Sequence, residues 1–167
     1  MDQMIRILGV DPGLRHTGWG VIAMDGPRLI WIAHGVIKPD TTADMAYRLA
    51  ILCDELRAVI EAHTPQEAAV EETFVNINPR STLLLGQARG AALATLAAAK
   101  LKVAEFAATK VKQSVVGTGA ADKTQVAFMV RRLLPKAGDV TADAADALAV
   151  AICGAHHRPL AHQRLKA

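Results

Sequence analysis

The sequence is poor in aromatic residues and in cysteine, and it lacks histidines and cysteines clustered as metal ligands. Aromatic residues make up 4% of the 167 residues, although hydrophobic residues make up 51%. Alanine, valine and leucine must therefore build the core, and a chain of this length most simply forms one domain. The two cysteines, Cys53 and Cys153, lie in apolar helical patterns. This placement predicts buried, reduced thiols in a cytosolic protein.

The chain also lacks a basic leader and an uninterrupted hydrophobic run of membrane-spanning length. Its opening residues, Met-Asp-Gln-Met, have no basic segment that leads into an apolar run, so no signal peptide is predicted. The long apolar stretch over residues 83–99 is short for a membrane span, and Gln87 and Arg89 interrupt it. We therefore expect a cytoplasmic protein that does not cross a membrane.

The net charge is only +3, but the charged residues are unevenly distributed along the chain. Residues 38–76 carry eight acidic residues against three basic ones, and residues 77–136 carry ten basic residues against two acidic ones. The segment after Gly154 is basic and contains no acidic residue. This distribution suits a polyanion bound over a metal site, although ordinary solvated helix faces would give the same counts.

The stretch from Ile5 to Gly13 organises the predicted fold. Its first six residues are nearly all apolar or glycine, which is typical of a strand buried on both faces, and we predict a strand over residues 4–10. Asp11 follows at the strand end, where Pro12-Gly13 forces a turn. A carboxylate beside a buried strand costs free energy unless a cation compensates it. Asp11 is therefore either a turn residue bonded to its own backbone or part of a charged site.

Hydrophobic periodicity elsewhere predicts an α/β fold. Further strands are expected over residues 18–23, 28–37, 67–72 and 103–107, with the first three strands of the chain forming an antiparallel meander. Helices are expected from a Thr42 cap to Pro65, from Ser81 to Ala99, from Thr109 to Val115, over residues 124–134, and over residues 142–153 between Thr141 and a Gly154 C-cap. The small residues Gly86, Gly90 and Ala94 recur every four residues, which favours internal packing over a dimer seam. We expect one domain over residues 1–155 and a basic tail over residues 156–167.

Three further acidic residues also lie at the ends of predicted elements. Glu71 ends the fourth strand, and Asp143 and Asp146 lie three residues apart on one face of the last helix. That helix is apolar nearly all round, so two carboxylates on a buried face destabilise each other unless a cation lies between them. Asp143 alone would also be stabilised by the helix dipole, because it lies in the first turn. If the strands are neighbours, Asp11 joins these residues at one end of the sheet. Carboxylates alone predict Mg²⁺ or Mn²⁺, and two ions about 3.5–4 Å apart would clamp a phosphodiester.

Five segments of the chain, taken in order, form a specific set. They are Gly9-Val10-Asp11-Pro12-Gly13 with Thr17-Gly18-Trp19-Gly20, Val70-Glu71-Glu72-Thr73-Phe74, Leu85-Gly86-Gln87-Ala88-Arg89-Gly90, Val111-Lys112-Gln113-Ser114-Val115-Val116-Gly117, and Ala142-Asp143-Ala144-Ala145-Asp146-Ala147-Leu148-Ala149. With this set the chain resembles the RuvC family of Holliday junction resolvases over residues 5–154. The resemblance implies an RNase H-like α/β fold, in which a five-stranded mixed sheet of three antiparallel and two parallel strands has helices on both faces.

The same resemblance implies a metal-dependent endonuclease of recombination and DNA repair. A homodimer would bind a four-way DNA junction and make symmetric paired nicks that leave 5′-phosphate and 3′-hydroxyl ends. The family's catalytic acids correspond to Asp11, Glu71, Asp143 and Asp146, which would bind two Mg²⁺ ions, with Mn²⁺ as a substitute. The implied partner is the RuvA–RuvB branch-migration complex, and the implied location is the nucleoid in the bacterial cytoplasm.

The DNA contacts that the resemblance implies come from other residues. Lys112 and Lys123 correspond to DNA-contacting lysines, and Phe74 corresponds to an aromatic near the junction centre; Arg80 is a further candidate for DNA binding. From the residues alone, Phe74 would either stack on an unpaired base or cover the core. The family usually has Gln at the position of Glu72, so this chain adds a negative charge near the site.

Three other functions account for parts of the sequence. Residues 117–124 differ from a phosphate-binding P-loop of an NTPase at one position, but Asp122 stands where the second glycine is needed. The opening over residues 9–13 also resembles sugar-kinase and actin-type ATPases, whose second domain and second phosphate loop do not fit in 167 residues. A non-catalytic junction-binding module would gain nothing from buried carboxylates that face phosphate.

Overall fold

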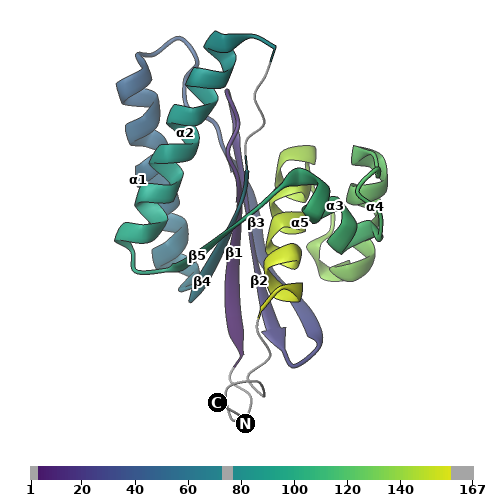
Figure 1. Ribbon diagram of the computed structural model, residues 1–167. Helices are drawn as coiled ribbons and strands as arrows, with labels where there is room; N and C mark the ends of the chain where they lie inside the picture. Colours follow the sequence, from purple (N-terminus) through teal and green to yellow (C-terminus); the bar gives the residue numbers. More distant parts are fainter. Residues whose placement is uncertain (1–3, 73–76, 159–167) are drawn as a thin grey trace, which may run out of the picture.

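Five strands form one mixed sheet in the order β3-β2-β1-β4-β5 (Figure 1). The computed structural model describes residues 4–72 and 77–158. The strands are β1 (Ile5–Asp11), β2 (Thr17–Asp25), β3 (Arg28–Ile37), β4 (Glu67–Glu71) and β5 (Lys102–Phe106). The first three form an antiparallel meander, and β4 and β5 run parallel to β1. The predicted strand number, meander and mixed sheet are confirmed.

Helices cover both faces of the sheet (Figure 1). One face carries α1 (Met45–His63) and α2 (Pro79–Ala98), and the other carries α3 (Ala108–Val116), α4 (Lys123–Leu133) and α5 (Ala142–His156), with a short 3₁₀ turn, η1 (Pro135–Ala137), before α5. No described helix has the length and hydropathy that crossing a membrane requires.

Side-chain alternation along the central strands determines which face each acid reaches. Ile7 and Ala69 belong to the core beneath α5, whereas Leu8 and Val70 belong to the core beneath α1 and α2. Because successive side chains on a strand point to opposite faces, the odd-numbered residues of β1 and β4 face α5. The last residue of each strand, Asp11 in β1 and Glu71 in β4, therefore faces α5 as well.

Glycines on β1 and β2 allow α5 to approach the sheet closely. A Cβ atom at Gly9 would overlap the backbone of Ala147, and one at Gly18 would overlap the carbonyl oxygen of Asp143. A Cβ atom at Gly20 would overlap the Leu148 side chain. The start of α5 carries Asp143 and Asp146. It can therefore pack against the sheet as observed only if these strand positions lack a side chain.

The Gly18→Ala variant is expected to displace the start of α5. Overpacking of this kind costs about 1–3 kcal/mol, and the clash here is with backbone, which cannot rotate away. We expect a melting temperature lower by several degrees for this variant. Gly119→Ala, in the loop before α4, where a Cβ meets no atom closer than 3.3 Å, is the matched control in melting measurements. Equal melting temperatures for the two variants would show that close approach at Gly18 is not required.

Several predicted helix ends were wrong by a few residues. Thr42 does not cap α1, because its hydroxyl donates to the Asp40 carboxylate instead. The N-cap of α1 is Asp44 rather than Thr42, and that of α2 is Asn78, whose side chain accepts hydrogen bonds from the N–H groups of Arg80 and Ser81. Thr141 caps α5 as predicted. β3 has the predicted bounds, and β4 and α5 start where predicted. The other bounds of the strands and helices shift by one to three residues.

Two predictions about glycines and small residues were also wrong. Gly154 does not end α5; it lies inside the helix, where a Cβ would meet the Cβ of Ala69 at 3.0 Å, and contact with the sheet carries the helix to His156. The stripe of Gly86, Gly90 and Ala94 is exposed, and the buried face of α2 is formed by Ala88, Ala92, Thr95 and Leu96. The stripe therefore does not pack internally.

The C-terminal helix ends close to the predicted domain boundary. Helix α5 ends at His156, next to the expected boundary at residue 155, and the predicted tail from residue 159 onward lies outside the described residues. Arg158, in the first part of that tail, donates to a Glu67 carboxylate oxygen at 2.8 Å. Both cysteines are free, with Cys153 fully buried and Cys53 half-buried.

Candidate metal and nucleic-acid site

Three of the four predicted acids line one pocket at the carboxyl end of the sheet. Val10 pairs with Val70 in the parallel ladder, so Asp11 and Glu71, one residue further on, end adjacent strands side by side. Asp146 reaches the same pocket from α5 across the face of the sheet. The pocket has a volume of about 250 Å³, which is ample for hydrated ions and a phosphate group.

The other walls of this pocket are basic and apolar. Lys112 from α3 and Lys123 from the first turn of α4 line it together with the acids. The apolar lining consists of Ala108, Val111, Val126 and Ala149. The two lysines that the sequence predicted as DNA contacts therefore lie beside the acids.

The three carboxyl groups lie in surroundings that disfavour their negatively charged form. Burial, followed by the charges of Glu71 and Asp146, raises the pKa of Asp11 to about 8. Burial is also the main cause that raises the pKa values of Glu71 and Asp146, although Lys112 and Lys123 oppose the shift at both residues. Clustered, desolvated carboxyls of this kind are typical of sites that take up a cation.

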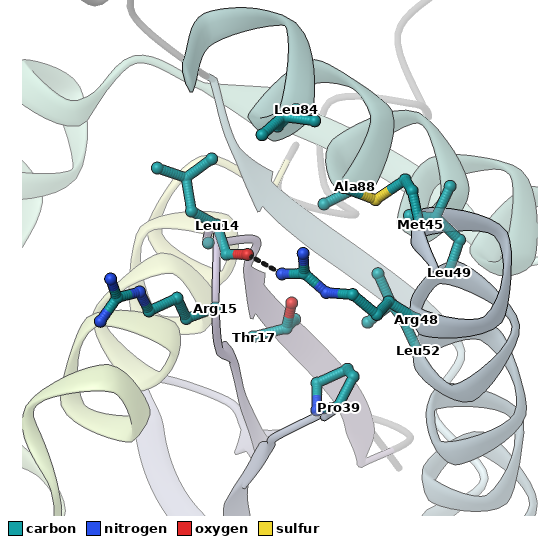
Figure 2. Close-up of a pocket in the computed structure, with 11 residues that line it drawn as sticks. Leu14, Arg15, Thr17, Pro39, Met45, Arg48, Leu49, Leu52, Leu84 and Ala88 are labelled. Carbon is teal, nitrogen blue, oxygen red and sulfur yellow. Dashed lines mark hydrogen bonds between the residues drawn. The ribbon is translucent and has the colours of Figure 1, made fainter. Parts of the chain in front are cut away.

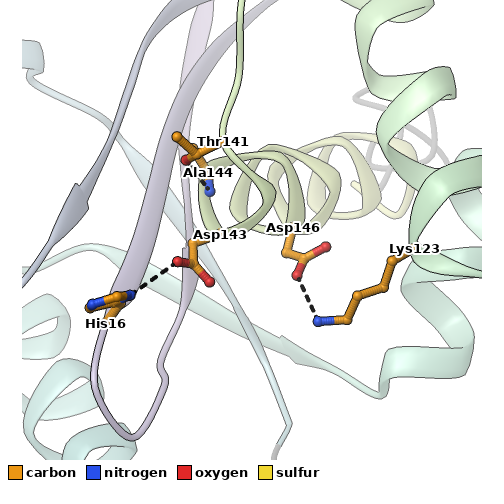
Figure 3. Close-up of polar contacts among 6 residues, drawn as sticks. All are labelled: His16, Lys123, Thr141, Asp143, Ala144 and Asp146. Atoms are coloured by element: carbon orange, nitrogen blue, oxygen red, sulfur yellow. Dashed lines mark hydrogen bonds and ion pairs between the residues drawn. The ribbon is translucent and has the colours of Figure 1, made fainter.

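Asp143 and Asp146 leave the start of α5 toward different partners (Figure 3). Asp146 lies 3.6 Å from the ammonium of Lys123, whereas Asp143 lies 3.3 Å from Nδ1 of His16, in the loop between β1 and β2. Asp143 does not line the pocket, although its charge contributes to the raised pKa values of Asp11 and Asp146. The structure therefore brings three predicted acids together and places the fourth at the rim.

The acidic side chains of the pocket are chemically suitable ligands for a hard divalent cation. Within residues 4–72 and 77–158, no three His, Cys, Asp or Glu side chains are placed to hold a metal ion as they stand. The pocket nevertheless offers carboxylate oxygens from two strand ends and a helix, which are the ligands preferred by Mg²⁺ and Mn²⁺. Mutual repulsion of like charges keeps such carboxylates apart, so binding of an ion would draw them inward.

The loop that follows Asp11 is held from the opposite side by α1. Arg48 donates from Nη2 to the carbonyl oxygen of Leu14 at 2.6 Å (Figure 2). Among the described residues, the Nε of Arg48 is buried without a hydrogen-bond partner, and it lies beside a cavity of about 20 Å³. A cavity of this size is large enough for one water molecule. Together with His16, Arg48 fixes the loop between Asp11 and Gly18.

The sequence analysis missed both His16 and Arg48 as supports of the site. His16 had one available signal, since it lies five residues after Asp11 in the same loop. Arg48 had none, because it belongs to an amphipathic helix whose packing against this loop is a tertiary feature.

Phe74 and Arg80 were also predicted as site residues. Phe74 falls outside the described residues. Arg80 is exposed in the first turn of α2 and does not line the acidic pocket. Glu72 is also exposed, and its charge is not among the causes that shift the pKa values of Asp11, Glu71 and Asp146. The added negative charge therefore acts outside the pocket.

The P-loop alternative is excluded by the start of α4. Asp122 caps this helix by accepting a hydrogen bond from the Gln125 N–H at 2.8 Å, and the Gln125 side chain accepts from the Asp122 N–H in return. This capping box places a carboxylate where a P-loop needs a bound phosphate. The segment over residues 117–124 is a helix start rather than a nucleotide site.

A mixed sheet in this strand order, with acids from β1, β4 and α5 at one pocket, defines an RNase H-like nuclease. The profile of the family described as crossover junction endodeoxyribonuclease RuvC matches residues 7–154. The chain belongs to the RuvC family.

Similar proteins agree with this assignment over nearly the whole chain. The crossover junction endodeoxyribonuclease RuvC of Hyphomonas neptunium is 62% identical over 98% of both chains. That of Caulobacter vibrioides is 61% identical over 92% of this chain and 90% of its own. The solved structure of T. thermophilus RuvC in complex with Holliday junction substrate is 31% identical, with a TM-score of 0.83 over 90% of this chain and 93% of that chain.

Proposed function

We propose that this chain is a crossover junction endodeoxyribonuclease that resolves four-way DNA junctions by paired, symmetric nicks. The main support for this proposal is the pocket in which desolvated acids cluster beside Lys112 and Lys123. The similar T. thermophilus protein is described in complex with a Holliday junction, which supports the same substrate here. The products would carry 5′-phosphate and 3′-hydroxyl ends, as recombination and repair require.

The acids would bind the metal that this reaction needs. Asp11, Glu71 and Asp146, with Asp143 from the rim, would hold two Mg²⁺ ions, for which Mn²⁺ would substitute. When bound, such ions activate a water molecule and stabilise the departing 3′ oxygen. The chain's own contribution is to hold the carboxylates at fixed strand and helix ends, so that the scissile phosphate meets oriented groups.

The two lysines would hold the DNA backbone at the pocket. Lys112 is half-buried in α3, whereas the Lys123 side chain is 84% exposed and extends over Asp146. Ammonium groups in these positions would bind phosphates on either side of the scissile bond. When DNA enters, the Lys123 ammonium would leave Asp146 and bind a phosphate, because the lysine side chain is long and largely exposed to solvent.

The proposed assembly is a homodimer, so that two pockets cut two strands. The exposed stripe of Gly86, Gly90 and Ala94 on α2 supports a close contact with a second copy, as do the exposed apolar side chains of Ile77 and Leu83. Phe74 and Arg80 would contact DNA near the junction centre. The proposed partner is a branch-migration complex of the RuvA–RuvB type, and the proposed location is the nucleoid in the bacterial cytoplasm.

A synthetic immobile junction tests this function directly. Incubated with the protein and Mg²⁺, each 5′-labelled strand pair should yield symmetric nicks on a denaturing gel, and a linear duplex of the same sequence should remain intact. The products should be sealed by ligase without further processing. Binding without nicking would favour the non-catalytic junction-binding module, and equal cutting of the duplex would remove the selectivity for junctions.

Junction affinity should fall steeply with salt. Lys112, Lys123 and the other basic residues of the α3–α4 face would neutralise phosphates and release counterions, so the logarithm of the affinity should fall linearly with that of the salt concentration. A Lys112→Ala, Lys123→Ala double variant should reduce the slope by about 2. Band-shift titrations at several salt concentrations measure the slope, and an unchanged slope would show that these lysines do not contact phosphate.

A further inference from the structure

Arg89 of α2 contacts two neighbouring strands at the carboxyl end of the sheet. Its Nε donates to the backbone carbonyl oxygen of Glu71 at 3.3 Å, and its Nη2 pairs with the carboxylate of Glu105 in β5. The Arg89 side chain is only 19% exposed, so the contact is sheltered from solvent. One guanidinium therefore joins α2, β4 and β5 beside the acidic pocket.

The contact acts on the backbone of Glu71 rather than on its carboxylate. Burial raises the pKa of Glu71, and the basic residues that oppose this shift are Lys112 and Lys123. Arg89 is not among them. Glu105 pairs in register with Val70, whose side chain faces α2, so Glu105 and Arg89 meet on the α2 face. The Glu71 carboxylate, on the opposite face, remains available to the pocket.

The end of β4 needs such a support because the strand is short. β4 has five residues and ends at Glu71, and the chain leaves the ladder after the Glu72 N–H donates to the Phe106 carbonyl oxygen. Helix α2 is in turn fixed to the sheet by the buried side chains of Ala88 and Ala92, which flank Arg89. A rigid helix thus holds the last residue of a short strand.

We propose that Arg89 is a positioning residue that holds the end of β4, so that the Glu71 carboxylate faces Asp11 and Asp146. This inference rests on the proposed nuclease function for its kinetic consequence only. A displacement of about 1 Å at a reacting centre can cost about 100-fold in rate. Arg89 would therefore affect turnover and metal affinity although it does not line the pocket.

Two variants and one matched control test the proposal. Arg89→Gln removes the charge, and Arg89→Lys keeps it but loses the planar fork that reaches Glu71 and Glu105 together. Arg158→Gln is the control, because Arg158 forms a similar arginine–glutamate pair with Glu67 at the opposite end of the same strand. Melting temperature, junction affinity, kcat at saturating junction and Mg²⁺, and Mn²⁺ affinity by calorimetry are measured for each.

Both Arg89 variants should lower kcat by about 10- to 100-fold and weaken Mn²⁺ binding severalfold, with junction affinity unchanged within about twofold. Arg158→Gln should lower the melting temperature without changing kcat or Mn²⁺ affinity. Arg89 variants that lower only the melting temperature would overturn the proposal, and so would an equal loss of kcat in Arg158→Gln. If the wild type does not cut junctions, the proposed function fails, and the Mn²⁺ affinities still decide the role of Arg89.

Discussion

The Asp146→Asn variant is expected to bind four-way junctions like the wild type and to cut them at least about 1,000-fold more slowly, a loss of about 4 kcal/mol of transition-state stabilisation. Asp146 comes from α5 and completes the pocket formed by Asp11 and Glu71 at the ends of β1 and β4. An amide of the same shape keeps the packing but provides one neutral oxygen in place of a charged carboxylate. Cations are then bound weakly, so the chemical step fails while the basic walls remain.

The matched control for this variant is Asp139→Asn. Asp139 is an exposed acid that precedes α5 and does not line the pocket. Single-turnover cleavage of a labelled junction and band-shift affinity should be measured for both variants. Retention of cleavage by Asp146→Asn within about tenfold of wild type would show that Asp146 is not part of the reacting site. A parallel loss of junction binding would instead indicate a folding defect.

Asp11→Asn is expected to abolish cleavage and, in excess chelator, to raise the melting temperature. The pKa of Asp11 is about 8 in the folded chain, against 3.8 for an ordinary aspartate. Between these values the folded state holds a proton that the unfolded state releases, so folding stability falls as pH rises from about 4 to about 8. The amide carries no charge at any pH, and the variant escapes this penalty.

The gain should therefore be small near pH 4 and full near pH 8. We expect at least about 1 kcal/mol at pH 8, which corresponds to about 2–4 °C for a chain of this size. Mg²⁺ should raise the melting temperature of the wild type by mass action and have little effect on the variant. Melting curves at pH 5 and pH 8, with chelator and with Mg²⁺, provide the comparison. A wild type that melts higher than the variant at pH 8 in chelator would contradict the buried-charge account.

The sequence predicted the strands well because their signals are local. Continuous apolar runs and the Pro12-Gly13 turn fix β1, and the short connections fix the meander. Helix starts were predicted less well. Asn78 caps α2 three residues before the expected Ser81, and α1 begins after Asp44, which makes no side-chain capping hydrogen bond. Choosing between adjacent polar residues requires the geometry of the chain that enters the helix.

The candidate site could likewise be predicted only in part. Asp11, Glu71 and Asp146 could be predicted because each lies at the end of a patterned element, and strand alternation then points them to one face. The contacts of the residues that support the site could not be predicted, although His16 lies in the same loop as Asp11. His16, Arg48 and Arg89 act through contacts with partners 16 to 127 residues away, which no local pattern encodes. The exposure of the small-residue stripe on α2 depends in the same way on which face of the helix meets the sheet.

The most direct test of the central claim is the position of Mn²⁺ in crystals of the protein, located by anomalous scattering. The account predicts that Mn²⁺ binds between the carboxylates of Asp11, Glu71 and Asp146, and that the Asp146→Asn variant loses this signal. A crystal in which Mn²⁺ binds elsewhere and leaves these three carboxylates without an ion would contradict it.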